Sequence, residues 1–220
     1  MTRMTPNLTN CRIIVFAKAP IPGKVKTRLL SSMDAQAAAT LHEQLVLHSL
    51  DTAIQAKVGP VDLWCTPKVE HPFFNSCARK FQVHLHPQPE GDLGKKMSYA
   101  FDQTLKRAPM ALLIGSDCPS LSGEDLKEAK TALQQGASAV ISPAEDGGYV
   151  LIGLRQNEPK LFEGVDWGTA SVMDQTRERF RELRWDWREL PERWDVDLPE
   201  DVERLKREGY GHLTPFKGEG

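Results

Sequence analysis

Short apolar runs alternate along the chain with longer segments of mixed polarity. The run Arg12–Ala17 is apolar after its first residue and rich in β-branched residues, and an Ala/Leu/Gln-rich segment follows it at residues 34–57. A continuous apolar run of this length is typical of a strand buried on both faces, and the mixed segment is typical of a helix. The start of the chain therefore predicts a strand, a loop and a helix.

The same alternation continues through the middle of the chain. The further elements that it predicts are strands at 61–65, 81–86 and 111–115, helices at 95–107, 126–135 and 172–183, and a helix that starts at Pro199. Two apolar runs within residues 139–154 flank Asp146-Gly-Gly148 and predict a hairpin. Strands separated by helices indicate an α/β fold, a single three-layer α/β/α domain around a mostly parallel central sheet.

The length of 220 residues fits one domain, and the sequence contains no repeat or linker. We expect an N-terminal extension at 1–11, the domain at 12–208 and a C-terminal tail at 209–220. The four cysteines form no C-x-x-C pair, so we interpret them as reduced thiols. His84 and His86 would share a strand face, but without a third ligand nearby a structural role is favoured over a metal site.

The charge balance excludes some classes of partner. The chain carries 28 Lys and Arg against 30 Asp and Glu, a formal net charge of −2. Binding to nucleic acid depends on a surplus of cations, so we expect no nucleic-acid partner. The apolar runs, such as Ile13–Ala17, are far shorter than the ~20 residues of a membrane-spanning helix. We therefore expect a cytoplasmic protein with no membrane partner.

The loop after the first predicted strand, residues 18–28, concentrates positive charge. Backbone N–H groups of a glycine-containing turn, together with lysine and arginine side chains, form a site suited to a di- or triphosphate. The loop is not a P-loop, because the Walker pattern needs glycine where Lys18 stands and Ser or Thr where Val25 stands. A solvated basic loop is the alternative. The candidate phosphate-binding residues are Lys18, Gly23, Lys26, Thr27 and Arg28.

Three aspartates are candidate metal ligands. Asp117 follows the apolar strand predicted at 111–115, where a carboxylate can hold Mg²⁺ or Mn²⁺ against the phosphates of a ligand. Asp195 and Asp197 would lie on one face of a strand, where two carboxylates repel each other unless a cation or a proton lies between them. The alternative for Asp197 is that it caps the helix starting at Pro199. We interpret Ser122, with Asp125, as the cap of the helix after Asp117.

The loop around Asp146 offers a general base. Asp146, or the neighbouring Glu145, could accept the proton of an acceptor hydroxyl. The alternative is that the Asp-Gly sequence only forms a hairpin turn and has no catalytic role. Trp167 lies in a later loop, where it could stack on a sugar or a base or simply pack. The candidate substrate-binding residues are Gly147, Gly148, Tyr149 and Trp167. Cys118 lacks a residue placed to activate its thiol, so a nucleophilic role is disfavoured.

Five ordered motifs resemble a known bacterial family. They are Phe16-Ala-Lys-Ala-Pro, Gly23-Lys-Val-Lys-Thr-Arg-Leu29, Gly115-Ser-Asp-Cys-Pro119, Asp146-Gly-Gly-Tyr149 and Asp195-Val-Asp-Leu-Pro-Glu-Asp201. Together they resemble DUF2064, whose members are described as glycosyltransferases associated with radical-SAM or selenodomain proteins, some of the arsenosugar-biosynthesis type. The resemblance runs from about Arg12 to Leu205.

The resemblance implies the fold of the GT-A nucleotide-diphosphosugar transferases, which is also similar to that of phospholactate guanylyltransferase-like nucleotidyltransferases. It matches Lys18, Lys26 and Arg28 to a phosphate-binding loop, Asp117 to the metal carboxylate, and Asp195 or Asp197 to a distal metal ligand. We therefore expect a metal-dependent transferase that moves a sugar from a nucleotide-sugar to a small-molecule acceptor. The alternatives are a nucleotidyltransferase that releases pyrophosphate and a non-catalytic nucleotide-binding partner.

Overall fold

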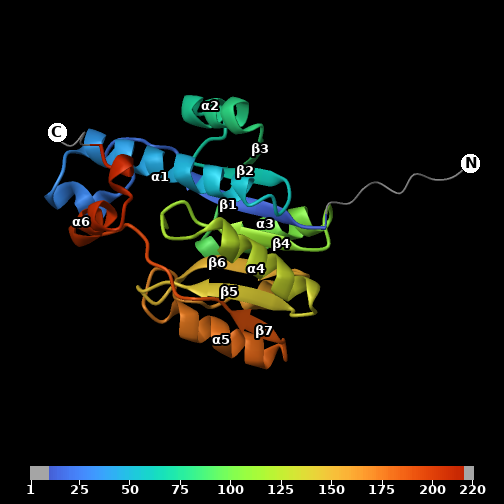
Figure 1. The fold of residues 1–220 in the computed structure, drawn as a ribbon. Helices are drawn as coiled ribbons and strands as arrows, with labels where there is room; N and C mark the ends of the chain where they lie inside the picture. The colour runs from blue at the N-terminus through green and yellow to red at the C-terminus, as the bar shows by residue number, and fades with distance from the viewer. Residues whose placement is uncertain (1–9, 216–220) are drawn as a thin grey trace, which may run out of the picture.

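A computed structural model describes residues 10–215 (Figure 1). Seven strands form one mixed sheet in the order β3-β2-β1-β4-β6-β5-β7, in which only β6 pairs antiparallel to its neighbours. The strands are β1 (Arg12–Lys18), β2 (Val61–Thr66), β3 (His84–Pro87), β4 (Ala111–Ile114), β5 (Ala139–Pro143), β6 (Tyr149–Leu154) and β7 (Trp187–Glu189). The predicted α/β class with a mostly parallel sheet is confirmed.

Helices cover both faces of the sheet. The six α-helices are α1 (Ala35–Gln55), α2 (Pro72–Phe81), α3 (Leu93–Leu105), α4 (Gly123–Gln134), α5 (Val172–Glu182) and α6 (Pro199–Arg207). The 3-10 helices of the described residues are η1 (Thr27–Ser31), η2 (Pro159–Leu161) and η3 (Gly211–Leu213). One apolar core joins α1, α2 and α4 to the sheet, and another joins α3 and α5 to its opposite face.

A third, smaller core holds the end of the described chain against its beginning. Leu29 of η1 and Leu41 of α1 pack there with Val196, Leu205 and Leu213. Figure 1 shows the result, with α6 lying beside the start of α1. Residues 1–9 of the expected extension and 216–220 of the expected tail lie outside the described residues.

The local sequence explains where several elements begin and end. Asp34 caps α1 by accepting a hydrogen bond from the N–H of Ala37 at 2.7 Å. The predicted capping box of Ser122 and Asp125 is present at α4. The strand predicted at 81–86 is wrong at its start, because Phe81 ends α2 and Gln82 then takes a left-handed backbone (φ 54°), so that β3 begins only at His84.

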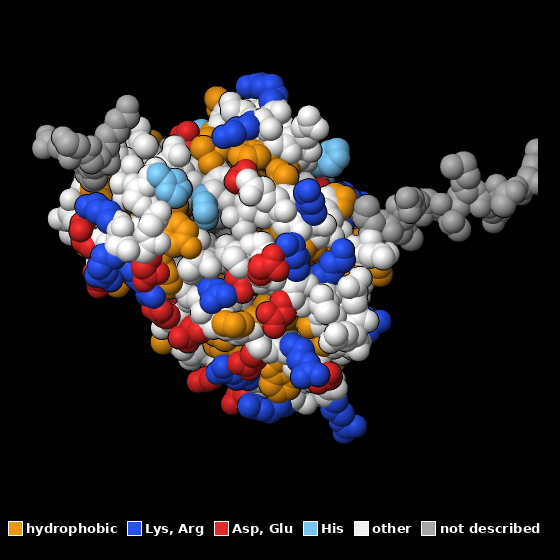
Figure 2. All heavy atoms as spheres, viewed as in Figure 1, with side chains coloured by type: hydrophobic (Ala, Val, Ile, Leu, Met, Phe, Trp, Pro, Cys, Tyr) orange, Lys and Arg blue, Asp and Glu red, His pale blue; other side chains and the backbone are white. Residues whose placement is uncertain are grey.

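The predicted hairpin of β5 and β6 is confirmed, and all four cysteines are free and buried. No helix among residues 10–215 has both the length and the apolar composition to cross a bilayer. Figure 2 shows Lys and Arg side chains interspersed with Asp and Glu over the face in view, in keeping with the near-neutral charge.

Candidate functional site

The main cavity opens at the edge of the sheet where β1 and β4 end. Its volume is about 510 Å³, and the loop after β1, the loop after β4 and the start of α3 border it. The positively charged residues that line it are Lys18, Lys24, Lys26, Arg28 and Lys96, and the negatively charged ones are Asp117 and Asp197. The surplus of positive charge suits an anionic ligand.

Lys26 combines a strained backbone with a buried ammonium. Its φ of 48° lies in the left-handed region, which costs a residue other than glycine roughly 1–2 kcal/mol. Its side chain is only 4% exposed, donates a hydrogen bond to the Val196 carbonyl at 2.6 Å and lies 2.9 Å from Oδ1 of Asp117. Strain of this kind persists where the surroundings fix the residue, and it is common at functional sites.

Asp117 follows β4 and faces the cavity. Its Oδ1 is buried against Lys26, with Nδ1 of His42 at 3.4 Å, whereas the side chain as a whole is 42% exposed. Burial acts to raise the pKa of Asp117, but the positive charge of Lys26, the largest opposing effect, helps to hold this pKa well below its ordinary value. The carboxylate is therefore ionised, and Oδ2 is the oxygen left to face a ligand.

His42 of α1 is a site residue that the sequence did not reveal. It is buried, and its Nε2 lies 3.0 Å from the carbonyl oxygen of Lys18. A carbonyl can only accept, so Nε2 is the donor and Nδ1 is the nitrogen that faces Asp117. A histidine on the buried face of a helix is also common in an ordinary core, so its sequence context gave no functional signal.

Of the other residues predicted for phosphate binding, three line the main cavity and one does not. Lys18, Thr27 and Arg28 line the cavity, and Arg28 forms an exposed ion pair with Asp197 at 2.5 Å. Gly23 does not line it. Its φ of 74° and the open space around it indicate that this glycine allows the loop to turn rather than contacting a ligand.

A smaller pocket of about 170 Å³ adjoins the main cavity, and Leu93 lines both. Four residues predicted to act on or bind the acceptor line this pocket: Asp146, Gly148, Tyr149 and Trp167. Gly147 is instead a packing position, because a Cβ there would lie 2.3 Å from the carbonyl oxygen of Ala170. Oδ1 of Asp146 accepts a hydrogen bond from the N–H of Gly148 at 2.8 Å, which fixes the carboxylate in the loop.

The strand predicted to carry Asp195 and Asp197 on one face is wrong. Residues 194–198 are an irregular segment, in which Asp195 lines the smaller pocket and Asp197 the main cavity. Asp197 does not cap α6, because the N-cap residue is Leu198 and the carboxylate of Asp197 pairs with Arg28. The carboxylate of Asp201 accepts hydrogen bonds from the N–H groups of Asp197 and Leu198 at 2.9 and 2.7 Å.

Asp195 is a carboxylate that is buried among other negative charges. Burial raises its pKa to about 6, and the negative charges of Asp146, Asp117 and Asp197 contribute, against an opposing effect of Lys26. The segment is held in place by hydrogen bonds of Val196, whose N–H donates to the Asp117 carbonyl at 2.9 Å and whose carbonyl accepts from Lys26.

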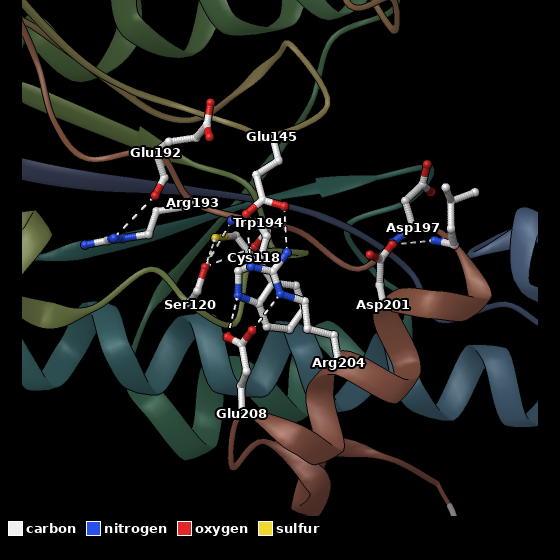
Figure 3. A network of polar contacts seen from close by, with 11 residues as sticks. Cys118, Ser120, Glu145, Glu192, Arg193, Trp194, Asp197, Asp201, Arg204 and Glu208 are labelled. Carbon is white, nitrogen blue, oxygen red and sulfur yellow. Dashed lines mark hydrogen bonds and ion pairs between the residues drawn. The ribbon is translucent and has the colours of Figure 1, made fainter.

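A polar network ties this segment to the loop that carries Asp146 (Figure 3). Arg204 of α6 binds both carboxylate oxygens of Glu145 at 2.6 and 2.9 Å, and its guanidinium lies 4.5 Å from the ring centroid of Trp194. Glu208 accepts hydrogen bonds from Arg204 and from the indole of Trp194 at 2.7 and 3.0 Å. The N–H of Glu145 also donates to the Arg193 carbonyl at 3.0 Å. These contacts fix the two acidic segments relative to each other.

The donor set fits a divalent cation bound together with a ligand. Within residues 10–215 no three His, Cys, Asp or Glu side chains form a metal site by themselves. Asp117 presents a half-exposed carboxylate, and Asp195 is a carboxylate whose charge is poorly balanced. Mg²⁺ is often held by one or two carboxylates, with phosphate and water oxygens completing the shell. The same hard oxygen donors suit Mn²⁺.

Comparisons with known proteins agree with this architecture. The model of a family described as "Uncharacterized protein conserved in bacteria (DUF2064)" matches residues 49–169. A structure from Desulfovibrio desulfuricans G20, whose description proposes a nucleotide-diphospho-sugar transferase, is 32% identical with a TM-score of 0.83, covering 91% of this chain and 88% of that one. The search of curated proteins found no match.

More distant structures share the fold. A CMP:2-keto-3-deoxy-manno-octonic acid synthetase in complex with CTP is 10% identical with a TM-score of 0.60, over 92% of this chain and 99% of that one. The glucosyl-3-phosphoglycerate synthase of Mycobacterium tuberculosis, in complex with Mn²⁺, UDP and glucosyl-3-phosphoglycerate, is 10% identical with a TM-score of 0.56, over 96% and 82%. Both nucleotidyl and glycosyl transferases therefore use this fold.

Proposed function

The chain belongs to the DUF2064 family, and from this premise we propose that it is a metal-dependent glycosyltransferase that uses a nucleotide-sugar donor. The observation that carries the proposal is the pair of adjoining cavities. The larger is lined by five Lys and Arg residues, and the smaller contains Asp146 and Asp195. A diphosphate fits the first and a hydroxyl acceptor fits the second.

The donor would lie with its diphosphate in the main cavity. Lys18, Lys24, Arg28 and Lys96 supply charge there, and the ordered ammonium of Lys26 lies at the inner wall beside Asp117. Such groups act best when they are fixed before the reaction, since they then stabilise developing charge without reorganising. A divalent cation held by Asp117 and Asp195 would add positive charge at the leaving phosphate.

The transfer itself exchanges one bond for another. The acceptor oxygen forms a bond to the anomeric carbon of the sugar, and the bond from that carbon to the phosphate oxygen breaks. The nucleoside diphosphate leaves with the electron pair, and the acceptor hydroxyl gives its proton to a carboxylate. Asp146 is the base in this proposal, because it lies in the smaller pocket and its orientation is fixed by Gly148.

A nucleotidyltransferase is the second candidate, and the five cations of the main cavity favour it specifically, because a triphosphate carries more charge than a diphosphate. In that reaction an oxygen of a phosphorylated co-substrate attacks the α-phosphorus and pyrophosphate leaves. The released product therefore separates the two candidates.

The test follows both products in one assay. The protein is first screened by thermal shift against nucleotides and nucleotide-sugars with and without Mn²⁺, since a ligand that binds the native state raises the melting temperature. The stabilising donor is then incubated with acceptors. Release of nucleoside diphosphate supports glycosyl transfer, release of pyrophosphate supports the second candidate, and release of neither on any donor contradicts both.

One variant and its control assign the turnover to the site. Asp117→Asn should abolish turnover while the protein stays folded. Glu124→Gln, which changes a carboxylate that is 82% exposed on the following helix, should leave turnover unchanged. Full activity of Asp117→Asn would remove Asp117 from the mechanism.

A further inference from the structure

A third cavity lies beyond the acceptor side of the proposed active site. Its volume is about 570 Å³, and it is formed by the first turns of α3 and by the loop between β6 and α5. Trp167 lines this cavity and also the smaller pocket that contains Asp146. The third cavity is therefore next to the proposed site of transfer, although none of its other residues has a role there.

Trp167 is fixed between the two spaces. A Cβ on Gly94 would lie 2.8 Å from Nε1 of Trp167 and 2.5 Å from the carbonyl oxygen of Phe162, so the indole rests directly on the backbone of α3. The ring of Tyr149 meets the indole edge-on at 6.3 Å. A glycine at the start of α3 thus allows the indole to form a wall that both pockets share.

The charge of the third cavity is opposite to that of the main cavity. It is lined by three carboxylates, those of Asp92, Asp102 and Glu163, and by one lysine, Lys95. Asp102 also pairs with Lys106 at 2.6 Å. Even with this lysine included, the charged groups at the cavity carry no net positive charge. A phosphate would meet net repulsion here, so this cavity does not suit a phosphorylated molecule.

The remaining lining residues suit a polyhydroxylated ligand. Tyr99 is 46% exposed although it is a large aromatic residue, and it lines the cavity together with Trp167. Ser98 and Asn157 form only long mutual hydrogen bonds, of 3.3 and 3.5 Å, which hydroxyl groups of a ligand could replace. Aromatic surfaces with a few polar groups are what a saccharide needs, since its C–H faces stack on rings and its hydroxyls bond to the polar groups.

We propose that the third cavity binds the body of the acceptor and that the acceptor is an uncharged, polyhydroxylated molecule of the saccharide class. This inference rests on the proposed glycosyl transfer and specifies its acceptor. The reacting hydroxyl lies beside Asp146, and the rest of the acceptor crosses the edge of Trp167 to reach Tyr99 and Asn157. A sugar phosphate, which the nucleotidyltransferase would need, is disfavoured at this position.

The experiment measures binding directly, so that it does not depend on turnover. Neutral mono- and disaccharides and the matching sugar phosphates are added to the full chain, and saturation-transfer NMR reports which of them bind. We expect at least one neutral saccharide to bind and its phosphate to bind more weakly by about tenfold or more. A sugar phosphate can also bind among the cations of the main cavity, so only binding that Asn157→Ala weakens is counted for the third cavity. Equal or tighter binding of the phosphates by this measure would overturn the inference, and so would no binding of any saccharide.

Variants locate the binding. Tyr99→Ala and, independently, Asn157→Ala should weaken the saccharide by about tenfold. Gln134→Ala is the control, because Gln134 is exposed on α4 and does not line the third cavity. Two lining variants are used because Tyr99 also lines a neighbouring pocket, where its ring centroid lies 5.9 Å from that of the buried Trp64. Unchanged binding in both would overturn the assignment.

The result is separable from the proposed function. If nucleotide-sugars bind and are cleaved but no saccharide binds, only the acceptor inference fails. If a saccharide binds in this cavity but no nucleotide binds or turns over, the glycosyltransferase proposal fails and the saccharide site stands.

Discussion

The ammonium of Lys26 lies 2.9 Å from Oδ1 of Asp117, and the same nitrogen donates to the carbonyl of Val196 at 2.6 Å. Lys26→Met keeps the length of the side chain but removes both interactions. We expect a loss of about 1–3 kcal/mol in the free energy of unfolding, measured by urea denaturation, because Oδ1 of Asp117 is left buried without its cation. Lys24→Met, at an exposed lysine of the same loop, is the control and should unfold like the wild type.

Because Asp62 is fully buried and paired with cations, we expect the free energy of unfolding to decrease at acidic pH. Burial acts to raise its pKa, but the imidazole of His86 at 3.4 Å, the hydrogen bonds from Arg12 and the charges of Arg12 and Arg107 hold this pKa well below the ordinary 3.8. A carboxyl whose pKa is lowered in the folded state contributes stability above its unfolded pKa and loses it as the pH falls below that value. The wild type should therefore lose stability progressively below about pH 4.

Asp62→Asn removes this contribution. Its free energy of unfolding should fall less steeply below pH 3.8, by up to about 1.4 kcal/mol per pH unit for one proton, in urea titrations at a series of pH values. Asp117 and Asp125 act in the same direction, so some dependence on pH remains. Glu128→Gln, at an exposed carboxylate, should follow the wild-type curve. Identical curves for Asp62→Asn and the wild type would contradict the prediction.

Replacing Asp195 should raise the stability of the protein but weaken its response to a divalent cation. Asp195→Asn removes one of several carboxylates that repel each other, so the melting temperature at neutral pH should rise by a few degrees, since 1 kcal/mol is worth about 2–4 °C in a chain of this length. Asp197→Asn is the control, because that carboxylate is already paired with Arg28. Adding Mn²⁺ should stabilise the wild type more than Asp195→Asn, and an equal effect on both would argue against Asp195 as a ligand.

Two glycines with similar backbone angles should respond differently to alanine. Gly147 has a φ of 86°, and backbone atoms of Ala170 lie 2.3–2.7 Å from where its Cβ would stand, whereas Gly23 has a φ of 74° and open space around it. Gly23→Ala should cost only the backbone strain of about 1–2 kcal/mol. Gly147→Ala should cost clearly more, because the loop must also move away from Ala170. Equal losses in thermal denaturation would show that the close approach has no energetic importance.

Arg204 predicts a link between α6 and the loop that carries Asp146. Arg204→Met removes the pairing with Glu145 and Glu208 and the contact with Trp194. Because these pairs are partly exposed, we expect a loss of only about 1 kcal/mol, but a larger decrease in turnover as the loop loses its anchor. Arg207→Met on the same helix is exposed and should change neither quantity. A stability loss with unchanged turnover would confine Arg204 to a packing role.

Much of the fold could be predicted because buried strands have a simple pattern. Ile13, Val15 and Leu112 lie in continuous apolar runs, which are typical of a sheet covered on both faces. The helix caps at Asp34 and Ser122 follow from local hydrogen bonding. The helix α2 was not predicted, because it has only ten residues and its last residue, Phe81, also fits the apolar pattern of the strand that follows. The three-residue strand β7 is too short to produce an alternating pattern.

The site was predictable in its residue types but not in its pairings. The loop after β1 and Asp117 follow strands, so their meeting at one edge of the sheet could be expected. The contact of His42 with Asp117 could not, because it depends on how α1 packs against the sheet. The different pockets of Asp195 and Asp197 arise because residues 194–198 are held by hydrogen bonds of Val196 rather than by a neighbouring strand.

The bond between Lys26 and Val196 also has a consequence for synthesis. The two residues are 170 positions apart, so the ribosome delivers the carbonyl that Lys26 requires only after β1 to β7 have emerged. Until then Lys26 has only Asp117 of its two partners, and Asp117 lacks the backbone N–H of Val196. The two pockets are therefore complete only after the segment that carries Asp195 and Asp197 has been added at the strand ends.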